Sequence, residues 1–128
     1  MSVEVRMCAG PLKAGSTIEA PSEAGARVVF EGVVRGHEGD RSIVALNYQA
    51  YRPMADEMLR SIAAETLAQF GLLAIHVEHS DGTVKVGECS FRLVIHAPHR
   101  KPAIAAMDAF IDRMKRDVPI WKTAIWSA

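Results

Sequence analysis

Strand patterns and helix patterns are grouped along this chain, and this grouping restricts its fold more than any other feature. Two runs rich in β-branched and aromatic residues, at 26–36 and 42–51, precede a helical pattern at 53–71. Further strand patterns within 72–97 precede a second helical pattern at 98–118. A doubly wound parallel sheet would place a helix between successive strands. We therefore expect an α+β fold with a mostly antiparallel sheet and two long helices.

The strand patterns suggest how neighbouring segments pair. Val3, Val5 and Met7 alternate with polar residues and predict a short first strand. Residues 26–36 and 42–51 are separated by a polar, glycine-containing loop, and we expect them to form a hairpin.

Both helical patterns have recognisable ends or faces. Pro53 suits the first position of the first helix, and Gly71 suits the position just past its end. Apolar residues recur at spacings of three and four in each helix, which is typical of a buried stripe. The expected stripes contain Met54, Met58 and Ile62 in the first helix, and Ile104, Met107, Ile111 and Met114 in the second.

Composition and charge narrow the class of protein. The 128 residues suggest one domain, 1–128, and 15 basic residues balance 15 acidic ones. Zero net charge argues against a general nucleic-acid or membrane-surface binder. No apolar stretch approaches the roughly 18 residues of a membrane span, and we expect no signal peptide. Cys8 and Cys89 form no C-x-x-C pair, so we expect a reducing compartment, the cytoplasm.

The segment DRMKRDVPIWK, residues 112–122, holds two lysines on either side of a rigid apolar link. Pro119 should end the helix, and we expect Trp121 to pack inward and position Lys122. Lys115 and Lys122 aimed into one pocket could act as nucleophile, proton shuttle or anion anchor. A solvated helix end also favours lysine, because of the helix dipole, and the spacing alone leaves both readings open.

Two further segments could bind an anion. In APHRKP, residues 97–102, the start of a helix carries His99 and Arg100, which suits a phosphate. Arg35 follows a strand and precedes Gly36, so it could reach a ligand beside a closely approaching backbone. An ordinary helix start and a surface arginine at a turn remain the alternatives.

A metal site is not expected. His76 and His79 would point to opposite faces of a strand, so this pair cannot chelate an ion unaided. Cys89 shares its strand face with apolar residues, and a buried thiol is a poor nucleophile.

Four segments together resemble the large, catalytic subunit of molybdopterin synthase, the MoaE family. They are VVFEGVVRGHEG, YQAYRPMADEML, GECSFRLVIHAPHR and IDRMKRDVPIWK, and the resemblance spans roughly residues 25 to 122. The last is the most specific, because a helix ending in lysine before Pro-Ile-Trp-Lys is typical of the family.

The resemblance implies an α/β-hammerhead-type fold and a homodimer at the centre of a heterotetramer. The partner would be a small ubiquitin-like sulfur carrier whose C-terminal thiocarboxylate donates sulfur to cyclic pyranopterin monophosphate, giving molybdopterin. It implies that Lys115 and Lys122 are catalytic and that Arg35, His99 and Arg100 bind substrate. Neither a metal nor a cofactor is expected.

The chain also departs from the family pattern. Gln49 stands where the family usually has Glu, Ser80 where it usually has Arg, and Thr123 where a basic residue usually follows the second lysine. These departures keep open a second hypothesis, a non-catalytic paralogue that binds the carrier protein or a pterin phosphate. The residues do not assign which lysine would meet the carrier tail.

Overall fold

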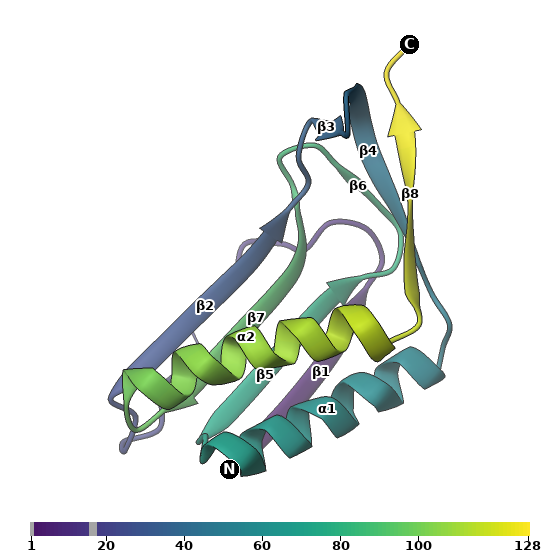
Figure 1. The fold of residues 1–128 in the computed structure, drawn as a ribbon. Coiled ribbons are helices and arrows are strands. Elements are labelled where there is room, and N and C mark those ends of the chain that lie inside the picture. The colour runs from purple at the N-terminus through teal and green to yellow at the C-terminus, as the bar shows by residue number, and fades with distance from the viewer. Residues whose placement is uncertain (1, 16–17) are drawn as a thin grey trace.

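The computed structural model describes residues 2–15 and 18–128, which form two sheets and two long helices (Figure 1). In chain order the elements are β1 (Ser2–Cys8), β2 (Ala26–Val33), β3 (His37–Glu38), β4 (Arg41–Ala50), α1 (Met54–Phe70), β5 (Ala74–Ser80), β6 (Thr83–Lys85), β7 (Cys89–Ala97), α2 (Arg100–Asp117) and β8 (Ile120–Trp126). No helix in the described part of the chain is long and apolar enough to cross a membrane.

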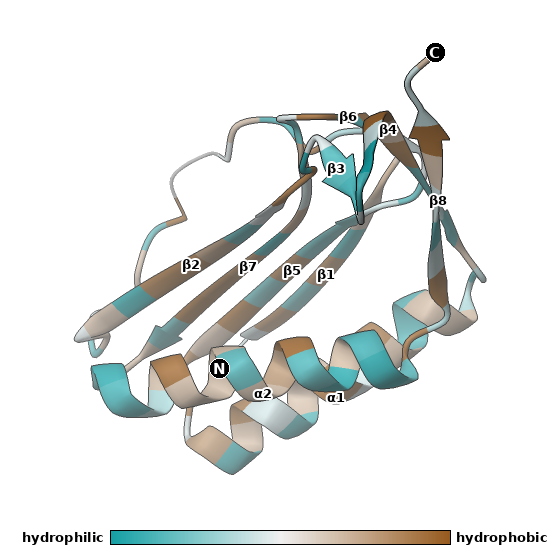
Figure 2. Cartoon of the chain, turned by 45° about the horizontal axis from the view of Figure 1, so that its top comes forward, coloured by the Kyte–Doolittle hydropathy of each residue, from teal (hydrophilic) through white to brown (hydrophobic). Residues whose placement is uncertain are grey.

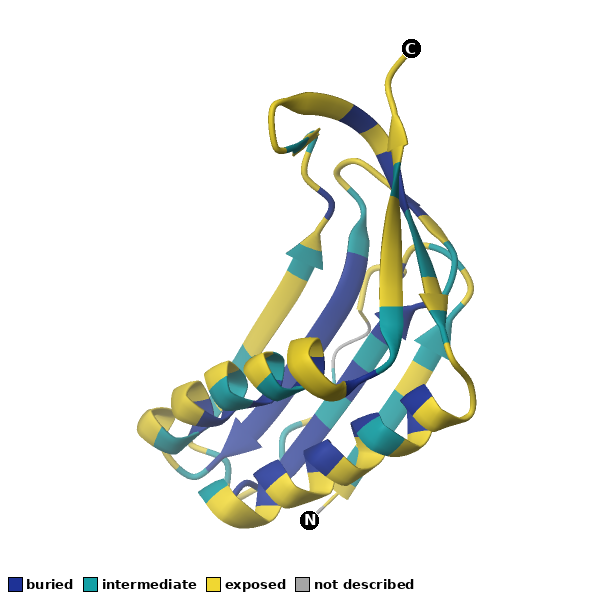
Figure 3. Ribbon diagram, turned by 45° about the vertical axis from the view of Figure 1, so that its right-hand side comes forward, coloured by how far each residue is buried: buried dark blue, intermediate teal, exposed yellow. Residues whose placement is uncertain are grey.

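The first sheet has the strand order β1-β5-β7-β2, and both helices lie over one of its faces (Figure 1). β1 pairs with β5 in parallel, whereas β5–β7 and β7–β2 are antiparallel. Apolar side chains from the helices and from the covered face form the main core, including Leu59, Ile75, Leu93 and Phe110, each with no exposed surface. Figure 3 shows β7 buried along most of its length.

The second sheet projects from one end of the first and contains β3, β4, β6 and β8 (Figure 1). All its pairings are antiparallel. A small core of Val34, Ile43, Leu46 and Val84 packs on one side of it. β3 is hydrophilic, whereas apolar residues recur along β4 and β8 (Figure 2). The α+β class with a mostly antiparallel sheet and two long helices is thus confirmed.

The expected hairpin between residues 26–36 and 42–51 is wrong. β2 pairs along its length with β7, from Ala26 opposite Ala97 to Val33 opposite Cys89. β4 instead belongs to the second sheet, where it pairs with β3, β6 and β8. Buried Val34 directs the chain out of the first sheet and into the core of the second. β2 finds its partner far along the sequence, where no turn signal specifies the pairing, and the local partner of β4 is only the short β3.

The predicted buried stripes of both helices need correction. Met54 is 48% exposed and Ile104 is 57% exposed, although both were expected in the core. The other predicted members do lie in or against the core: Met58, Ile62, Met107, Ile111 and Met114. The buried face of α2 is rotated by about one residue and consists of Ala103, Ala106, Phe110 and Met114. Two alanines in this face allow the helix axis to approach its neighbours closely, while Phe110 fills the core.

The ends of α1 agree closely with the sequence. Gly71 adopts the left-handed conformation, with φ of 64°, directly after the helix. The N–H of Leu72 donates to the carbonyl of Leu67 at 3.0 Å, which closes the last turn. Pro53 immediately precedes the first helical residue, one position earlier than expected.

Candidate active site

The junction between α2 and β8 carries both predicted catalytic lysines. Lys115 lies in the last turn of α2, and Lys122 is the third residue of β8. Pro119 separates the two elements, and its carbonyl accepts a hydrogen bond from the N–H of Tyr51 at 3.0 Å. This bond fixes the junction to the end of β4. Both lysine side chains are exposed in the single chain.

The expectation that Trp121 packs inward is wrong, because its side chain is 59% exposed. In β8 alternate residues face opposite sides of the sheet. Trp121 lies opposite Gln49 on β4, and Lys122 lies opposite Tyr48. Lys122 therefore shares its side of the sheet with Leu46 and Tyr48, which belong to or pack against the small core. Figure 3 shows that β8 is largely exposed.

Arg35 lies on a backbone segment that is fixed on both sides while its side chain is exposed. Val34 exchanges hydrogen bonds with the β6–β7 turn: its N–H donates to Glu88 at 3.1 Å, and its carbonyl accepts from Gly87 at 2.9 Å. The carbonyl of Gly36 accepts from the N–H of Ile43 at 3.0 Å. Arg35 is thus presented from a rigid loop at the base of the second sheet.

His99 and Arg100 lie at the start of α2. His99 is the N-cap residue in an extended conformation, and its side chain makes no capping hydrogen bond. The first turn contains no acidic residue, and both side chains are exposed. Free backbone N–H groups, the positive end of the helix dipole and the Arg100 guanidinium all favour an anion here.

The five predicted residues fall into two groups within one chain. Arg100 and Lys115 are separated by most of α2, about 22 Å at the usual rise of an α-helix. Arg35 follows the end of β2 that lies beside Cys89, whereas His99 follows the opposite end of β7. The segment after β2 and the α2–β8 junction, which carry Arg35, Lys115 and Lys122, lie toward the second sheet. The start of α2, which carries His99 and Arg100, lies at the far end of the first sheet; the elements are labelled in Figure 1.

Sequence reasoning missed a cluster of polar and aromatic residues beside Lys122. The Tyr48 hydroxyl donates to Ser90 Oγ at 3.1 Å, and Ser90 Oγ donates to the carbonyl of Gly32 at 3.3 Å. The Tyr48 ring meets the His79 ring edge-on, with centroids 5.4 Å apart. These residues lie in separate strands, and no local pattern brings them together.

His79 is a buried, neutral base in this cluster. Its side chain is 6% exposed, and burial lowers the pKa of the imidazole. Nδ1 lies 2.9 Å from the carbonyl oxygen of Ser80. Because a carbonyl can only accept, the proton resides on Nδ1 and the lone pair on Nε2.

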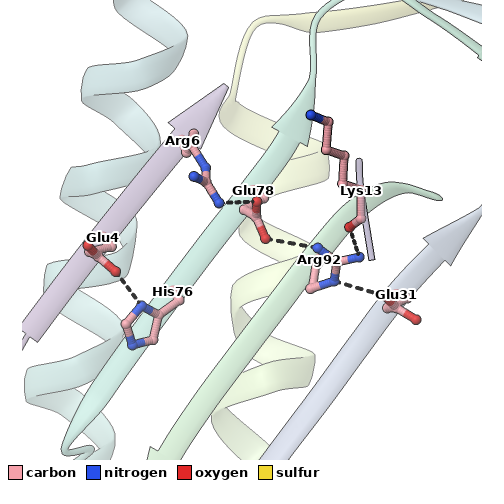
Figure 4. A network of polar contacts seen from close by, with 7 residues as sticks. All are labelled: Glu4, Arg6, Lys13, Glu31, His76, Glu78 and Arg92. Atoms are coloured by element: carbon pink, nitrogen blue, oxygen red, sulfur yellow. Dashed lines mark hydrogen bonds and ion pairs between the residues drawn. The ribbon is translucent and has the colours of Figure 1, made fainter. Parts of the chain in front are cut away.

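A cavity separate from these residues lies over the face of the first sheet that the helices leave open. It has a volume of about 1280 Å³, and none of the five predicted residues lines it. Its polar network is shown in Figure 4 and consists of Glu4, Arg6, Lys13, Glu31, His76, Glu78 and Arg92.

Buried Arg92 is the centre of this network. Its guanidinium donates to Glu31 at 2.8 Å, to Glu78 at 3.0 Å and to the carbonyl of Lys13 at 2.8 Å. The network thereby ties the segment around Lys13 to three strands (Figure 4). Each of its carboxylates has a cationic or imidazole partner, which suits a structural role.

The described residues offer neither an assembled metal site nor an activated thiol. No group of three or more His, Cys, Asp or Glu side chains in residues 2–15 and 18–128 is placed to hold a metal ion. Cys8 and Cys89 are free and partly buried, and burial raises the pKa of both thiols. A thiol with a raised pKa is a weak nucleophile.

Comparison with known sequences identifies close relatives. The family model described as MoaE protein matches residues 8–117. A Bacillus subtilis protein named molybdopterin synthase catalytic subunit is 39% identical over 104 residues, which cover 81% of this chain and 66% of the relative. A protein of the same name from Coccidioides immitis is 40% identical over 99 residues. The chain covers only half of that relative.

A solved structure shows the same arrangement of elements. Molybdopterin synthase from Staphylococcus aureus superposes with a TM-score of 0.84 at 32% identity, covering 94% of this chain and 90% of that one. The family match spans both the loop of Arg35 and the helix that carries His99, Arg100 and Lys115. This chain belongs to the MoaE protein family.

Proposed function

We propose that this protein is the sulfur-transferring, catalytic subunit of a molybdopterin synthase. It converts cyclic pyranopterin monophosphate to molybdopterin, using sulfur from the C-terminal thiocarboxylate of a small ubiquitin-like carrier protein. The observation that carries the proposal is the pair Lys115 and Lys122, held on either side of the α2–β8 junction in a chain of this family.

The chemistry of the two reactants fits the charges at this end of the molecule. The thiocarboxylate and the cyclic phosphate are both anions, and Arg35, Lys115 and Lys122 are cations on exposed, well-anchored positions. Each transfer moves one sulfur to the pterin side chain and converts the carrier thiocarboxylate into a carboxylate. A lysine ammonium can neutralise the incoming anion and then donate a proton to a departing oxygen.

The positions of His99 and Arg100 imply that a complete substrate site needs two copies of the chain. Within one chain these residues are separated from Lys115 by about 22 Å of helix, too far for one small substrate to touch both groups. In a homodimer, the α2 start of one copy can lie beside the α2–β8 junction of the other. We propose this arrangement, with one carrier bound at each end of the dimer as a heterotetramer.

A non-catalytic, binding paralogue is the alternative. Ser80 stands where an arginine is usual, and its hydroxyl donates to the carbonyl of Gly10 at 2.6 Å in a fully buried position. It therefore offers no cation to a substrate. Gln49 is exposed on β4, opposite Trp121, and leaves that position uncharged. Both lysines are nevertheless present, which favours catalysis.

Reconstitution tests the proposal. The purified protein is mixed with thiocarboxylated carrier and cyclic pyranopterin monophosphate, and molybdopterin is measured as its fluorescent oxidation product. Formation of product supports the synthase. Carrier binding without product would favour the binding paralogue. The two free cysteines fit a reducing compartment, and we place the reaction in the cytoplasm.

A further inference from the structure

We infer that Tyr48 is a positioning residue for Lys122, and that Ser90 and His79 hold the Tyr48 ring in place. This inference deepens the proposed function, since Lys122 is one of its two catalytic lysines. It is based on the strand register, the contacts of the phenol and the position of the hydrogen-bonded partners in the fold.

The strand register places Tyr48 and Lys122 directly opposite each other on β4 and β8. Side chains at opposed positions of an antiparallel pair lie on the same face, with their Cβ atoms about 4.5–5.5 Å apart. The methylene groups of Lys122 can therefore lie along the Tyr48 ring. Lys122 is exposed, and in the described chain β8 pairs only with β4, so no second neighbouring strand restricts its side chain.

The Tyr48 ring is held at two points. Its hydroxyl donates a hydrogen bond to Ser90 Oγ, and the Ser90 hydroxyl in turn donates to the carbonyl of Gly32. The direction of both hydrogen bonds is therefore fixed. The edge-on contact with the buried His79 ring restricts the movement of the Tyr48 ring. A ring fixed in this way limits the rotamers open to Lys122.

The same hydrogen bonds connect two parts of the proposed site. Gly32 lies in β2, three residues before Arg35, and Tyr48 lies in β4, opposite Lys122. The Tyr48–Ser90–Gly32 chain therefore joins the strand that leads into Arg35 to the strand pair that carries Lys122. Its expected effect is to fix the Lys122 ammonium relative to the Arg35 guanidinium.

The first test needs no enzymatic activity. Lysine acylation rates are measured by peptide mass spectrometry in the wild type, Tyr48→Phe and Ser90→Ala, with Tyr51→Phe as control. Tyr51 is a neighbouring tyrosine whose side chain is 59% exposed. Freeing the ring should raise the Lys122 rate at least about twofold, since more rotamers become accessible. Lys101 serves as the internal standard and should keep its rate.

Unchanged Lys122 labelling in both Tyr48→Phe and Ser90→Ala would overturn the inference. An equal rise at Lys101 would also overturn it, because that result indicates general loosening of the fold. Tyr51→Phe should label like the wild type. Tyr48→Phe and Ser90→Ala each remove only a hydroxyl group, and circular dichroism establishes that each variant is folded before labelling.

The second test uses turnover and rests on the proposed function. Tyr48→Phe should lower kcat about tenfold and leave KM within about twofold, because it misplaces a catalytic group and removes no substrate contact. In a Lys122→Ala background the same substitution should cause no further loss. Equal losses in both backgrounds would show a merely structural role. If the wild type forms no product, the proposed function fails, and the labelling test still decides the role of Tyr48.

Discussion

At the scale of single residues, burial separates the ionisable groups at the α2–β8 junction into two kinds. Lys115 and Lys122 are exposed and free to meet anionic reactants. His79 is buried behind Tyr48, neutral, and fixed in one tautomer by the Ser80 carbonyl. Charge is thus kept at the surface of the junction, while its interior contains an uncharged imidazole that supports the aromatic cluster.

The buried state of His79 predicts a pH dependence of stability. Burial lowers the pKa of His79, and of His96 in the same direction, so below about pH 6.5 the unfolded chain binds protons that the folded chain does not. The free energy of unfolding should therefore be highest above that pH and decrease as the pH falls from 7.5 to 5.5. Urea denaturation at both pH values measures the difference.

The matched variant is His79→Gln, which cannot titrate in this range. Its unfolding free energy should depend less on pH than that of the wild type, with the remaining dependence due largely to His96. An equal or steeper dependence in the variant would mean that His79 does not resist protonation in the folded state.

At the scale of elements, α2 both completes the core and connects the two ends of the proposed site. Its buried face consists of two alanines, Phe110 and Met114, while Ile104 points to solvent. The helix begins with His99 and Arg100 and ends with Lys115, so its length sets the distance between the two groups of predicted residues. Its packing therefore determines the geometry of the site.

The corrected face of α2 predicts contrasting effects of two substitutions. Phe110→Ala should destabilise the protein by about 3–5 kcal/mol, since it leaves a cavity in the main core. Ile104→Ala should change stability by less than about 0.5 kcal/mol, because the side chain is already largely exposed. Urea unfolding of both variants measures the difference. A loss for Ile104→Ala as large as that for Phe110→Ala would mean that Ile104 packs in the core, as the sequence pattern predicted.

The sequence predicted local features well and long-range pairing poorly. Both helices, the glycine that ends α1 and most of the strands were read from local signals. The partner of β2 was not predicted from the sequence, because the pairing of β2 with β7 joins segments some sixty residues apart. β8 was missed since IWKTAIW lacks regular alternation, and it is stabilised by pairing with β4. Family motifs suggested the candidate site residues, and only the structure shows how far apart they lie.

At the scale of the whole molecule, the residues of the proposed site are divided between two opposite ends of the folded chain. The second sheet carries Lys122 and projects away from the first, while His99 and Arg100 lie at the opposite end of α2 (Figure 1). In a twofold-symmetric homodimer, the α2 start of each copy can lie beside the α2–β8 junction of the other copy. This arrangement gives two equivalent composite sites.

Composite sites predict complementation between inactive variants. Lys122→Ala and Arg100→Ala should each be nearly inactive alone. After the two are mixed, partially unfolded and refolded together, half of the dimers should be mixed, and each should contain one intact site. Activity should then recover to about a quarter of the wild-type value. No recovery, with mixed dimers present by mass spectrometry, would show that each site is built from one chain.

The central claim is that Lys115 and Lys122 carry out sulfur transfer, and single-turnover kinetics test it most directly. Preformed complex of the protein with thiocarboxylated carrier is mixed with cyclic pyranopterin monophosphate, and molybdopterin formation is followed in the wild type, Lys115→Ala, Lys122→Ala and Lys101→Ala. We expect each of the first two variants to be at least about 100-fold slower, since each removes a group that transfers protons or stabilises developing charge. Lys101→Ala should match the wild type. Wild-type rates in both Lys115→Ala and Lys122→Ala would contradict the account.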